Sequence, residues 1–279
     1  MRHVDVPADE LWVCHLRHIR YSDGVAIQET VRARRQAGEL PDTMLLREHP
    51  PVYTRGRRAG AEDLPFPEDH YRAKGIDVAS TDRGGKLTYH GPGQLVGYPI
   101  MAIHDVLAHL RTMEDAIVAA LAQWGIAARS RAAEGVDYTG VWVADRKIAS
   151  IGVHVSRGVT THGFAVNVDN DLDAFSSVVA CGLPDVQMTS IAAELERSGH
   201  DRADCDSPAS GLAPAARAPR LACFRKEIAY RFCEAHGRRQ RLVSARRLGI
   251  DTTPSICGAP TGAQPIKSKS SPDRQPVPA

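Results

Sequence analysis

The sequence predicts an α+β domain with a largely antiparallel or mixed sheet and flanking helices. Strand and helix patterns are interspersed along residues 1–198, and tight turns join neighbouring strands. Of the 279 residues, 43% are hydrophobic, which is ample for a proper core. We therefore expect one main domain, over residues 1–198, followed by a tail.

The first helix is predicted to begin at a cap formed by Ser22 and Asp23 and to end before Gly38. A short strand follows at Leu45 and Leu46 and leads into Glu48. The clearest helix begins after His104 and Asp105 and ends at Gly125, because apolar residues recur there at every third or fourth position. Its apolar stripe, which we expect to face the core, comprises Val106, Leu107, Leu110, Met113, Ile117, Leu121 and Trp124.

Residues 141–155 predict a β-hairpin with its turn at 144–146, and a further strand covers residues 160–168. If residues 147–155 form one strand, a period of two places Lys147 on the apolar face with Ala149, and His154 on the opposite face. A lysine on an apolar face has two explanations. It reaches water from the strand end, or it is partly desolvated and directs its ammonium at a functional thiol.

The C-terminal part differs in composition from the rest. Residues 199–220 are rich in Ala, Pro, Ser and Asp, which predicts a linker. Residues 238–279 start with a basic block and continue as a Pro/Ser/Lys-rich stretch, so we expect disorder there. A solvated extension is favoured over a nucleic-acid contact, since short basic blocks are common. Residues 221–237 predict a helix that packs on the domain through Leu221, Phe224, Ile228 and Phe232.

The six cysteines are scattered, without a C-x-x-C pair or a suitably spaced histidine partner. We therefore expect neither a metal site nor a structural disulfide. The chain does not start with a basic segment followed by an apolar one, and no apolar run approaches the roughly 18 residues of a membrane span. A cytoplasmic, reducing location without membrane association is expected.

The segment 83–94, RGGKLTYHGPGQ, joins four glycines to Arg, Thr, Tyr and His. Glycine lets the backbone approach a ligand closely or adopt positive φ, so the segment predicts a wall of a binding site. A Gly/Pro-rich turn is the alternative interpretation. Other motifs along the chain decide between the two.

The segment resembles the R-G-G-x-x-T-Y-H-G-P-G-Q signature of the lipoyl(octanoyl) transferase family. Further blocks agree with this family in order and spacing, and the resemblance runs from about Leu11 to Glu196. It implies a biotin/lipoyl protein ligase-like fold, with residues 1–198 as the catalytic octanoyltransferase domain, and no cofactor. The further blocks are EHPPVYT at 48–54, KIASIGV at 147–153, HGFAVN at 162–167 and ACGL at 180–183.

Cys181 is the candidate nucleophile. A thiol acts only as thiolate, so this role requires a nearby cation or helix N-terminus; otherwise a lone cysteine is more commonly a small buried hydrophobe. The resemblance implies that the family's Cys-Lys dyad falls on Cys181 and Lys147. Cys181 would then take an octanoyl group from octanoyl-acyl carrier protein, as a thioester. A lysine of a lipoyl domain would take it next, in 2-oxoacid dehydrogenase complexes or the glycine cleavage H protein.

The resemblance also implies which residues bind the acyl group. His90 and His162 are expected to orient the substrate or hold a loop rather than act as a base, because the family's pattern supplies Lys as the partner of the thiol. The implied substrate-binding residues are Arg83, Gly84, Gly85, Lys86, Leu87, Thr88, Tyr89, His90, Ser150, Ile151, Gly152, Gly163, Phe164 and Ala165.

Two alternatives stay open. An ATP-dependent lipoate or biotin ligase of the same fold needs a phosphate cradle but no thiol, and residues 53–60, YTRGRRAG, faintly resemble its Gly/Arg-rich loop. No G-x-x-x-x-G-K-[ST] motif occurs in the chain. The second alternative is a catalytically idle binding protein whose basic tail engages nucleic acid.

Overall fold

A mixed sheet forms the centre of the computed structural model, which describes residues 9–178, 186–199 and 217–250. Its strand order is β12-β1-β2-β6-β10-β9-β8-β7, and β11 pairs with β9. Strand β1 runs parallel to β2 and β12, β11 runs parallel to β9, and the other neighbours are antiparallel. The predicted α+β class with a mixed sheet is confirmed. The strands are β1 (Glu10–His18), β2 (Thr43–Glu48), β6 (Gln94–Ile100), β7 (Arg129–Ser130), β8 (Gly140–Val143), β9 (Arg146–Ser156), β10 (Val159–Asn167), β11 (Gln187–Met188) and β12 (Arg239–Leu242).

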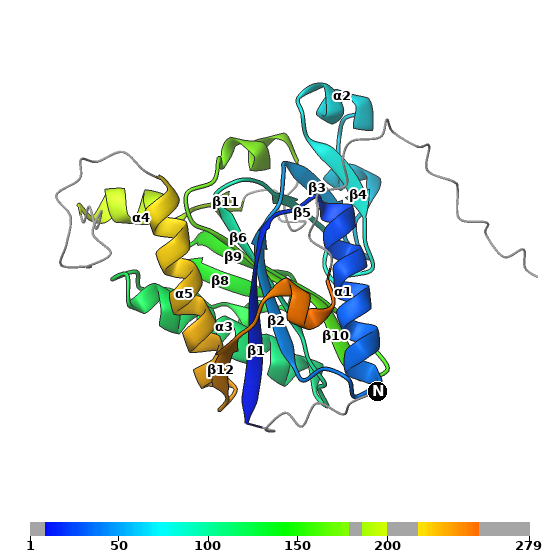
Figure 1. The fold of residues 1–279 in the computed structure, drawn as a ribbon. Helices are drawn as coiled ribbons and strands as arrows, with labels where there is room; N and C mark the ends of the chain where they lie inside the picture. The colour runs from blue at the N-terminus through cyan, green and yellow to red at the C-terminus, as the bar shows by residue number, and fades with distance from the viewer. Residues whose placement is uncertain (1–8, 179–185, 200–216, 251–279) are drawn as a thin grey trace, which may run out of the picture.

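Helices cover both faces of this sheet (Figure 1). Helices α3 (Val106–Ala122) and α5 (Arg217–Ala235) lie together on one face, and α1 (Tyr21–Gln36) lies on the other. The short helix α4 (Ile191–Ser198) follows β11. The face under α3 and α5 carries the larger core, which includes Leu46, Met113, Ile117, Phe164, Val166, Phe224, Ile228 and Phe232.

Local sequence explains where helix α3 begins, but not where α1 begins. Asp105 caps α3 as predicted, because its carboxylate accepts hydrogen bonds from the backbone N–H groups of Leu107 (2.8 Å) and Ala108 (3.0 Å). Helix α1 begins at Tyr21, earlier than predicted, and no side chain caps it. The expected core position is wrong for Val106 and Leu107, which are 41% and 65% exposed because this first turn extends beyond the core.

A smaller sheet stands beside the large one and carries the segment 83–94. Its order is β4-β3-β5, from β3 (Val52–Arg55), β4 (Asp77–Ser80) and β5 (Leu87–His90), and helix α2 (Glu68–Ala73) packs on it. It has its own core, and the N–H of Gly84 donates to the carbonyl of Val153 on β9 (2.9 Å). The small sheet therefore presents its loop to the edge of β9. Its core comprises Tyr53, Leu64, Tyr71, Leu87, Tyr89 and Phe175.

The disorder expected for residues 238–279 is wrong for residues 238–250. Strand β12 pairs with β1, Arg239 and Arg241 form ion pairs with Asp9 (2.7 Å) and Glu10 (3.0 Å), and Leu248 in the following turn is fully buried. Composition suggested a solvated basic block, but two of its arginines pair with acidic residues at the start of the described chain. Residues 251–279 and the expected linker at 200–216 lie outside the described residues.

Helix α5 begins at Arg217, before the predicted start at Leu221, and its apolar stripe packs against α3. The expectation that no cysteine forms a disulfide is wrong for Cys223, which is disulfide-bonded. Sequence spacing alone does not reveal which cysteines meet in space. No helix in the described ranges is long and apolar enough to cross a membrane.

Candidate active site

A cleft of about 270 Å³ lies where the small sheet meets β9 and β10. Lys147 and all of the expected substrate-binding residues except Tyr89 line it, although they come from three separate motifs. The structure thus gathers these motifs around one space. They are Arg83, Gly84, Gly85, Lys86, Leu87, Thr88, His90, Lys147, Ser150, Ile151, Gly152, Gly163, Phe164 and Ala165.

Tyr89 belongs to the core of the small sheet instead. Side chains alternate along β5, so Thr88 and His90 face the cleft while the Tyr89 ring packs against Tyr53 and Phe175 at centroid distances of 5.6 and 5.5 Å. Tyr89 therefore packs in the core of the small sheet and does not line the cleft.

Sequence reasoning missed several residues of the cleft. They come from the start of α1, from the loop after β3, from β6, from the first two turns of α3 and from the loop before β8, and they share no motif. Only tertiary structure brings them together; the exposed Val106 and the buried tyrosines had no signal in the sequence beyond their apolar character. These residues are Tyr21, Arg58, Val96, Tyr98, Val106, Leu110, Val136, Asp137 and Thr139.

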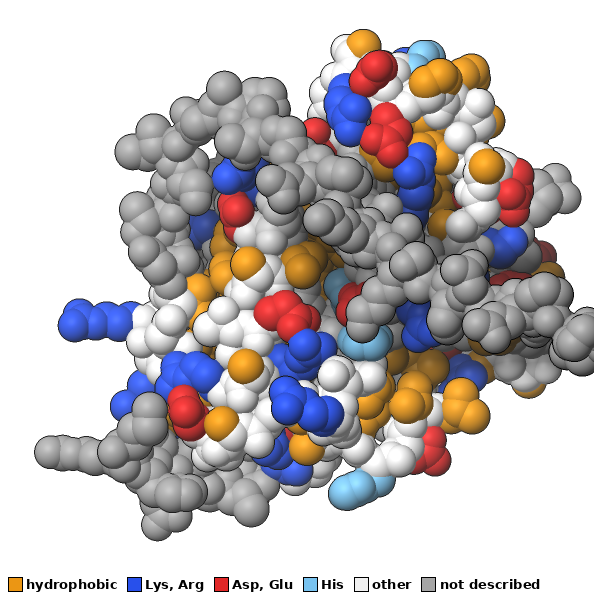
Figure 2. Space-filling model, turned by 90° about the vertical axis from the view of Figure 1, so that its right-hand side faces the viewer, with side chains coloured by type: hydrophobic (Ala, Val, Ile, Leu, Met, Phe, Trp, Pro, Cys, Tyr) orange, Lys and Arg blue, Asp and Glu red, His pale blue; other side chains and the backbone are white. Residues whose placement is uncertain are grey.

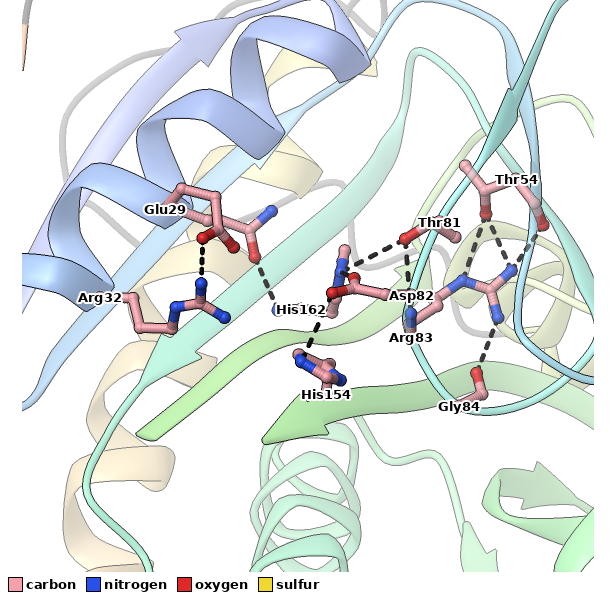
Figure 3. A network of polar contacts seen from close by, with 10 residues as sticks. Glu29, Arg32, Thr54, Thr81, Asp82, Arg83, Gly84, His154 and His162 are labelled. Atoms are coloured by element: carbon pink, nitrogen blue, oxygen red, sulfur yellow. Dashed lines mark hydrogen bonds and ion pairs between the residues drawn. The ribbon is translucent and has the colours of Figure 1, made fainter. Parts of the chain in front are cut away.

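Arg83 lines the cleft but uses its guanidinium within the protein (Figure 3). Its Nη2 donates to the carbonyl (2.6 Å) and hydroxyl (2.9 Å) oxygens of Thr54, and its Nη1 donates to the carbonyl of Gly84 (3.0 Å). Arg83 is 8% exposed. Hydrogen bonds to a charged donor are about twice as strong as neutral ones, so Arg83 fixes the wall in place.

Two glycines of the wall are required by close backbone approach. A Cβ on Gly152 would lie 2.8 Å from the carbonyl oxygen of Gly84. A Cβ on Gly163 would lie 2.3 Å from the carbonyl oxygen of Gly97, and its φ of +158° also favours glycine. The motifs at 147–153 and 162–167 therefore contain glycine where β9 and β10 contact neighbouring backbone.

Lys147 is 1% exposed and lies on the cleft side of β9. The predicted face was wrong, because the register between β8 and β9 shifts: Trp142 pairs with Lys147, whereas Val141 pairs with Ala149. Paired residues share a face and successive residues alternate, so this irregularity moves Lys147 to the face opposite Ala149. His154, expected on the other face, shares the face of Lys147 for the same reason.

His162 ties the loop before Arg83 to β10 (Figure 3). Its Nε2 lies 2.8 Å from Asp82 Oδ1 and 3.3 Å from the hydroxyl of Thr81, and its backbone N–H donates to the side-chain carbonyl of Gln28 (2.6 Å). His154 also reaches Asp82, at 3.5 Å. Burial lowers the pKa of His162, although Asp82 acts in the opposite direction. His162 therefore holds the wall, as expected from the sequence.

Residues 56–59 give no free phosphate cradle. The backbone N–H groups of Gly56, Arg57 and Arg58 donate to carbonyls of residues 83–86 at 3.0 Å each, and that of Ala59 donates to Gly56. Arg58 forms an exposed ion pair with Asp137 across the cleft (2.9 Å). The loop thus supports the wall, and its amides are already used.

Cys181 lies outside the described residues, so the structure does not test its pairing with Lys147. The described chain resumes at Val186, and Met188 pairs with Lys147 across β11 and β9. The thiols of Cys14 and Cys233 are unsuited to nucleophilic attack, because burial raises their pKa to about 11 and about 12. In the described ranges, no group of three or more His, Cys, Asp or Glu residues could hold a metal ion.

The mixed sheet and the motif-lined cleft place the chain in the structural class of lipoate ligases. It resembles a lipoate-protein ligase A bound with ATP, at TM-score 0.61 and 18% identity, with 84% of this chain and 88% of the other covered. It also resembles a bi-partite lipoate protein ligase from Thermoplasma acidophilum, at TM-score 0.58 and 19% identity, with 84% and 87% covered. These likenesses concern the fold alone.

Residues 20–204 match the family of lipoyl protein ligase A/B catalytic domains. Two relatives, each named octanoyltransferase, share 47% identity with the chain. The one from Acidothermus cellulolyticus aligns over 184 residues, 64% of this chain and 80% of its own length. The one from Solibacter usitatus aligns over 190 residues, 67% of this chain and 84% of its own length. The chain belongs to this family and, within it, to the lipoyl(octanoyl) transferases.

Proposed function

We propose that the protein transfers an octanoyl group from octanoyl-acyl carrier protein to a lysine of a lipoyl domain, through a thioester at Cys181. The observation that carries this proposal is Lys147, an almost fully buried lysine in the same cleft as the signature segment 83–90. A cation in a water-poor site stabilises a nearby thiolate strongly. The octanoyltransferase names of the relatives support the same reaction.

In the first step the Cys181 thiolate attacks the carbonyl carbon of the carrier's thioester. A bond forms between this carbon and the sulfur of Cys181, and the bond between the carbon and the carrier's sulfur breaks. The leaving thiolate of the carrier takes a proton from the Lys147 ammonium. In the second step the amine of the target lysine attacks the octanoyl-Cys181 carbonyl. The amide forms, the Cys181 thiolate is released, and neutral Lys147 takes the proton of the amine. No ATP is consumed, since the thioester is already activated.

The lining of the cleft suits an acyl chain. Val106, Leu110 and Val136 supply apolar surface beside the basic side chains of Lys86 and Lys147. An octanoyl tail would bury its methylene groups against the apolar side chains, and each buried methylene would stabilise binding by about 0.8 kcal/mol. The carbonyl of the octanoyl group would lie at the polar wall.

The backbone of residues 56–59 favours transfer over the ATP-dependent alternative. A ligase would need free N–H groups for the nucleotide phosphates, but these amides donate to the wall. The idle nucleic-acid-binding alternative is disfavoured because Arg239 and Arg241 of the basic block form ion pairs with Asp9 and Glu10. On the face shown in Figure 2, acidic side chains also lie among the basic ones.

The proposal is tested by incubating the protein with octanoyl-acyl carrier protein and measuring its intact mass. We expect one added octanoyl group at Cys181, removed by hydroxylamine and absent in Cys181→Ala. A parallel incubation with free octanoate and ATP should add nothing. Acylation of another residue, transfer by Cys181→Ala, or acylation that requires ATP would each contradict the mechanism.

The acceptor is tested in a second incubation. The isolated octanoyl-enzyme is mixed with a lipoyl domain of a 2-oxoacid dehydrogenase complex, or with the glycine cleavage H protein. We expect the octanoyl mass to move from the enzyme to the acceptor. An acceptor whose target lysine is replaced by Arg should receive nothing, and an octanoyl-enzyme that releases only free octanoate with both acceptors would refute this half of the proposal.

A further inference from the structure

A chain of buried amide side chains runs from the cleft to Thr189, whose backbone N–H donates to the carbonyl of Lys147. Asn167 at the end of β10 is 1% exposed, and its Nδ2 lies 2.9 Å from the backbone carbonyl oxygen of Thr189. A backbone carbonyl can only accept a hydrogen bond, so the atom that faces it must be the NH2 group of Asn167. The side-chain oxygen of Asn167 therefore faces the other way, toward Gln94.

The orientation of Gln94 follows from the same reasoning. One terminal atom of its side chain lies 3.0 Å from Asn167 Oδ1 and 3.0 Å from the backbone carbonyl oxygen of Tyr89. Both of these partners only accept, so this atom is the NH2 nitrogen, which donates to both. The side-chain oxygen of Gln94 then lies 2.8 Å from His90 Nδ1 and can only accept. His90 Nδ1 must therefore carry a hydrogen.

The other ring nitrogen of His90 is thereby defined. Burial lowers the pKa of His90 to about 3, so the imidazole is neutral near pH 7. A neutral imidazole with hydrogen on Nδ1 has a lone pair on Nε2. His90 is 6% exposed and lines the cleft, and no hydrogen bond from the described residues reaches its Nε2.

The neighbouring rings do not supply a donor. The Tyr21 ring stacks on His90 at a centroid distance of 5.9 Å, and the His49 ring lies 5.8 Å away. Both nitrogens of His49 are occupied, one by the carbonyl of Ile19 (2.7 Å) and one by the hydroxyl of Tyr98 (2.8 Å). No hydrogen bond from a described residue uses this acceptor, so it is available to a donor that enters the cleft.

We propose that His90 Nε2 accepts a hydrogen bond from an N–H group of a substrate bound in the cleft, and that Gln94 and Asn167 are positioning residues that fix the required tautomer. This inference rests on the proposed octanoyl transfer and deepens it. Two substrates offer N–H groups close to the reacting carbonyl: the amides of the donor's pantetheine arm and the amine of the acceptor lysine.

The tautomer is tested without catalysis, by long-range 1H–15N NMR on protein labelled at histidine nitrogens. His90→Gln identifies the resonances by their loss. We expect hydrogen on Nδ1 and an unprotonated Nε2, and hydrogen on Nε2 would overturn the inference. In Gln94→Glu, a carboxylate replaces the neutral partner and stabilises imidazolium, so the titration of His90 should move to higher pH. An unmoved titration would contradict the positioning role of Gln94.

The ligand is tested in Cys181→Ala, which cannot be acylated. Octanoyl-pantetheine is added to one sample and a lipoyl domain to another, and the Nε2 resonance of His90 is followed. A shift with octanoyl-pantetheine alone assigns the donor's amides, and a shift with the lipoyl domain alone assigns the lysine amine. The absence of a shift with either probe overturns the proposal, whether or not the wild-type protein proves to be an octanoyltransferase.

Kinetics of the two half-reactions give an independent check in the wild-type background. His90→Leu removes the acceptor, and we expect the half-reaction whose substrate shifted the resonance to slow by about tenfold, the effect of one lost hydrogen bond. His90→Gln, which can place an oxygen near the position of Nε2, should recover part of this rate. Equal rates for wild type and His90→Leu in both half-reactions would refute the role.

Discussion

The ammonium of Lys147 lies 5.2 Å from the centroid of the Trp142 ring, on the rung where the two residues pair across β8 and β9. The face of an indole attracts a cation, by about 2 kcal/mol when water is excluded. Lys147 is only 1% exposed and lines the cleft. The contact with Trp142 therefore holds its positive charge at one wall of the cleft. The irregular register between the two strands is what makes the contact available.

We predict that Lys147→Ala shifts the reactivity of Cys181 to higher pH. Loss of a nearby cation disfavours the thiolate, so the pH profile of iodoacetamide labelling should move upward by about one unit or more. Lys147→Arg should restore the positive charge but not the proton transfer. We therefore expect it to recover iodoacetamide labelling of Cys181 to a greater extent than the rate of octanoyl transfer. Lys86→Ala, at the other lysine that lines the cleft, serves as the control. Superimposable profiles for wild type and Lys147→Ala would refute the pairing.

Gly152→Ala should displace the wall of the cleft. The new methyl group would lie 2.8 Å from the carbonyl of Gly84, and the backbone must move to relieve this contact. We expect a loss of about 1–3 kcal/mol in the free energy of unfolding, together with weaker octanoyl transfer. Gly84→Ala is the matched control, because its nearest neighbour, the carbonyl oxygen of Val153, would lie at an ordinary 3.4 Å. Equal stabilities of the two variants in urea would disprove the close-approach argument.

Much of this site could be predicted from local sequence, and the rest depended on tertiary structure. The segment 83–90 was found because glycines and polar residues at fixed spacing give a local signal. The face of Lys147 was mispredicted, since a strict period of two assumes a regular ladder and the shift opposite Trp142 is set by pairing with β8. Tyr21 and Tyr98 were missed because they reach the cleft from α1 and β6.

The same distinction holds for the fold. Asp105 and the periodic stripe after it predicted α3 correctly, because a capping carboxylate and a helical face are local properties. Residues 238–250 were mispredicted, since their order comes from contacts with Asp9 and Glu10, which are distant in sequence. The composition of a segment indicates how much apolar surface the segment itself can bury. It does not reveal the partners that a distant segment supplies.

Arg47 is expected to destabilise the fold. It is fully buried two positions after Leu45 on the same face of β2, and none of its guanidinium nitrogens has a hydrogen-bond partner in the described part of the chain. Its guanidinium carbon lies 5.1 Å from the centroid of the Tyr98 ring, and Asp23 adds a weaker attraction from further away. A contact of this kind contributes up to about 2 kcal/mol, which is less than the several kcal/mol that desolvation of a charge costs. Burial accordingly lowers the pKa of Arg47.

We therefore predict that Arg47→Met, which keeps a long unbranched side chain, raises the free energy of unfolding by about 1–3 kcal/mol. The measurement is a urea titration in which the midpoint moves and the slope does not. Leu45→Ala, at the neighbouring position on that face, should lose about 2–5 kcal/mol and confirms that the site reports on the core. A lower stability for Arg47→Met would show that the charge is compensated.

Truncation after Gly237 should destabilise the protein. It removes β12 together with Leu248 and Ile250, which are 0% and 7% exposed. Burial of each of these side chains contributes about 1.5–3 kcal/mol. Truncation after Ile250 is the matched control, because it keeps β12, Leu248 and Ile250, and it should keep a higher thermal midpoint than truncation after Gly237. Equal midpoints for the two shortened chains would show that residues 238–250 contribute nothing to the core.

Acid should weaken the fold through buried histidines. Burial lowers the pKa of His109 on α3 from 6.5 to about 4. Between these two values the unfolded chain binds a proton that the folded chain does not, so stability falls as the pH is lowered through this window, by about 1.4 kcal/mol per pH unit for one histidine. Above pH 6.5 His109 is neutral in both the folded and the unfolded chain, so it no longer makes the free energy of unfolding depend on pH.

His109→Gln should therefore reduce the dependence of the free energy of unfolding on pH between about 6.5 and 4. The slope should fall by up to about 1.4 kcal/mol per pH unit. Thr112→Ala, a substitution on the same helix that removes no titrating group, should keep the wild-type slope. The test is a series of urea titrations across the window, and a wild-type slope in His109→Gln would contradict the assignment.

The pairing of β1 with β12 joins segments that are 230 residues apart at Asp9 and Arg239. During synthesis β1 leaves the ribosome early. Its edge toward β12 stays unpaired until almost all of the described chain has been made. An open strand edge is a template for pairing with other chains. Translation speed over the second half of the message, and chaperones that bind nascent chains, should thus influence the yield of folded protein more than its final stability does.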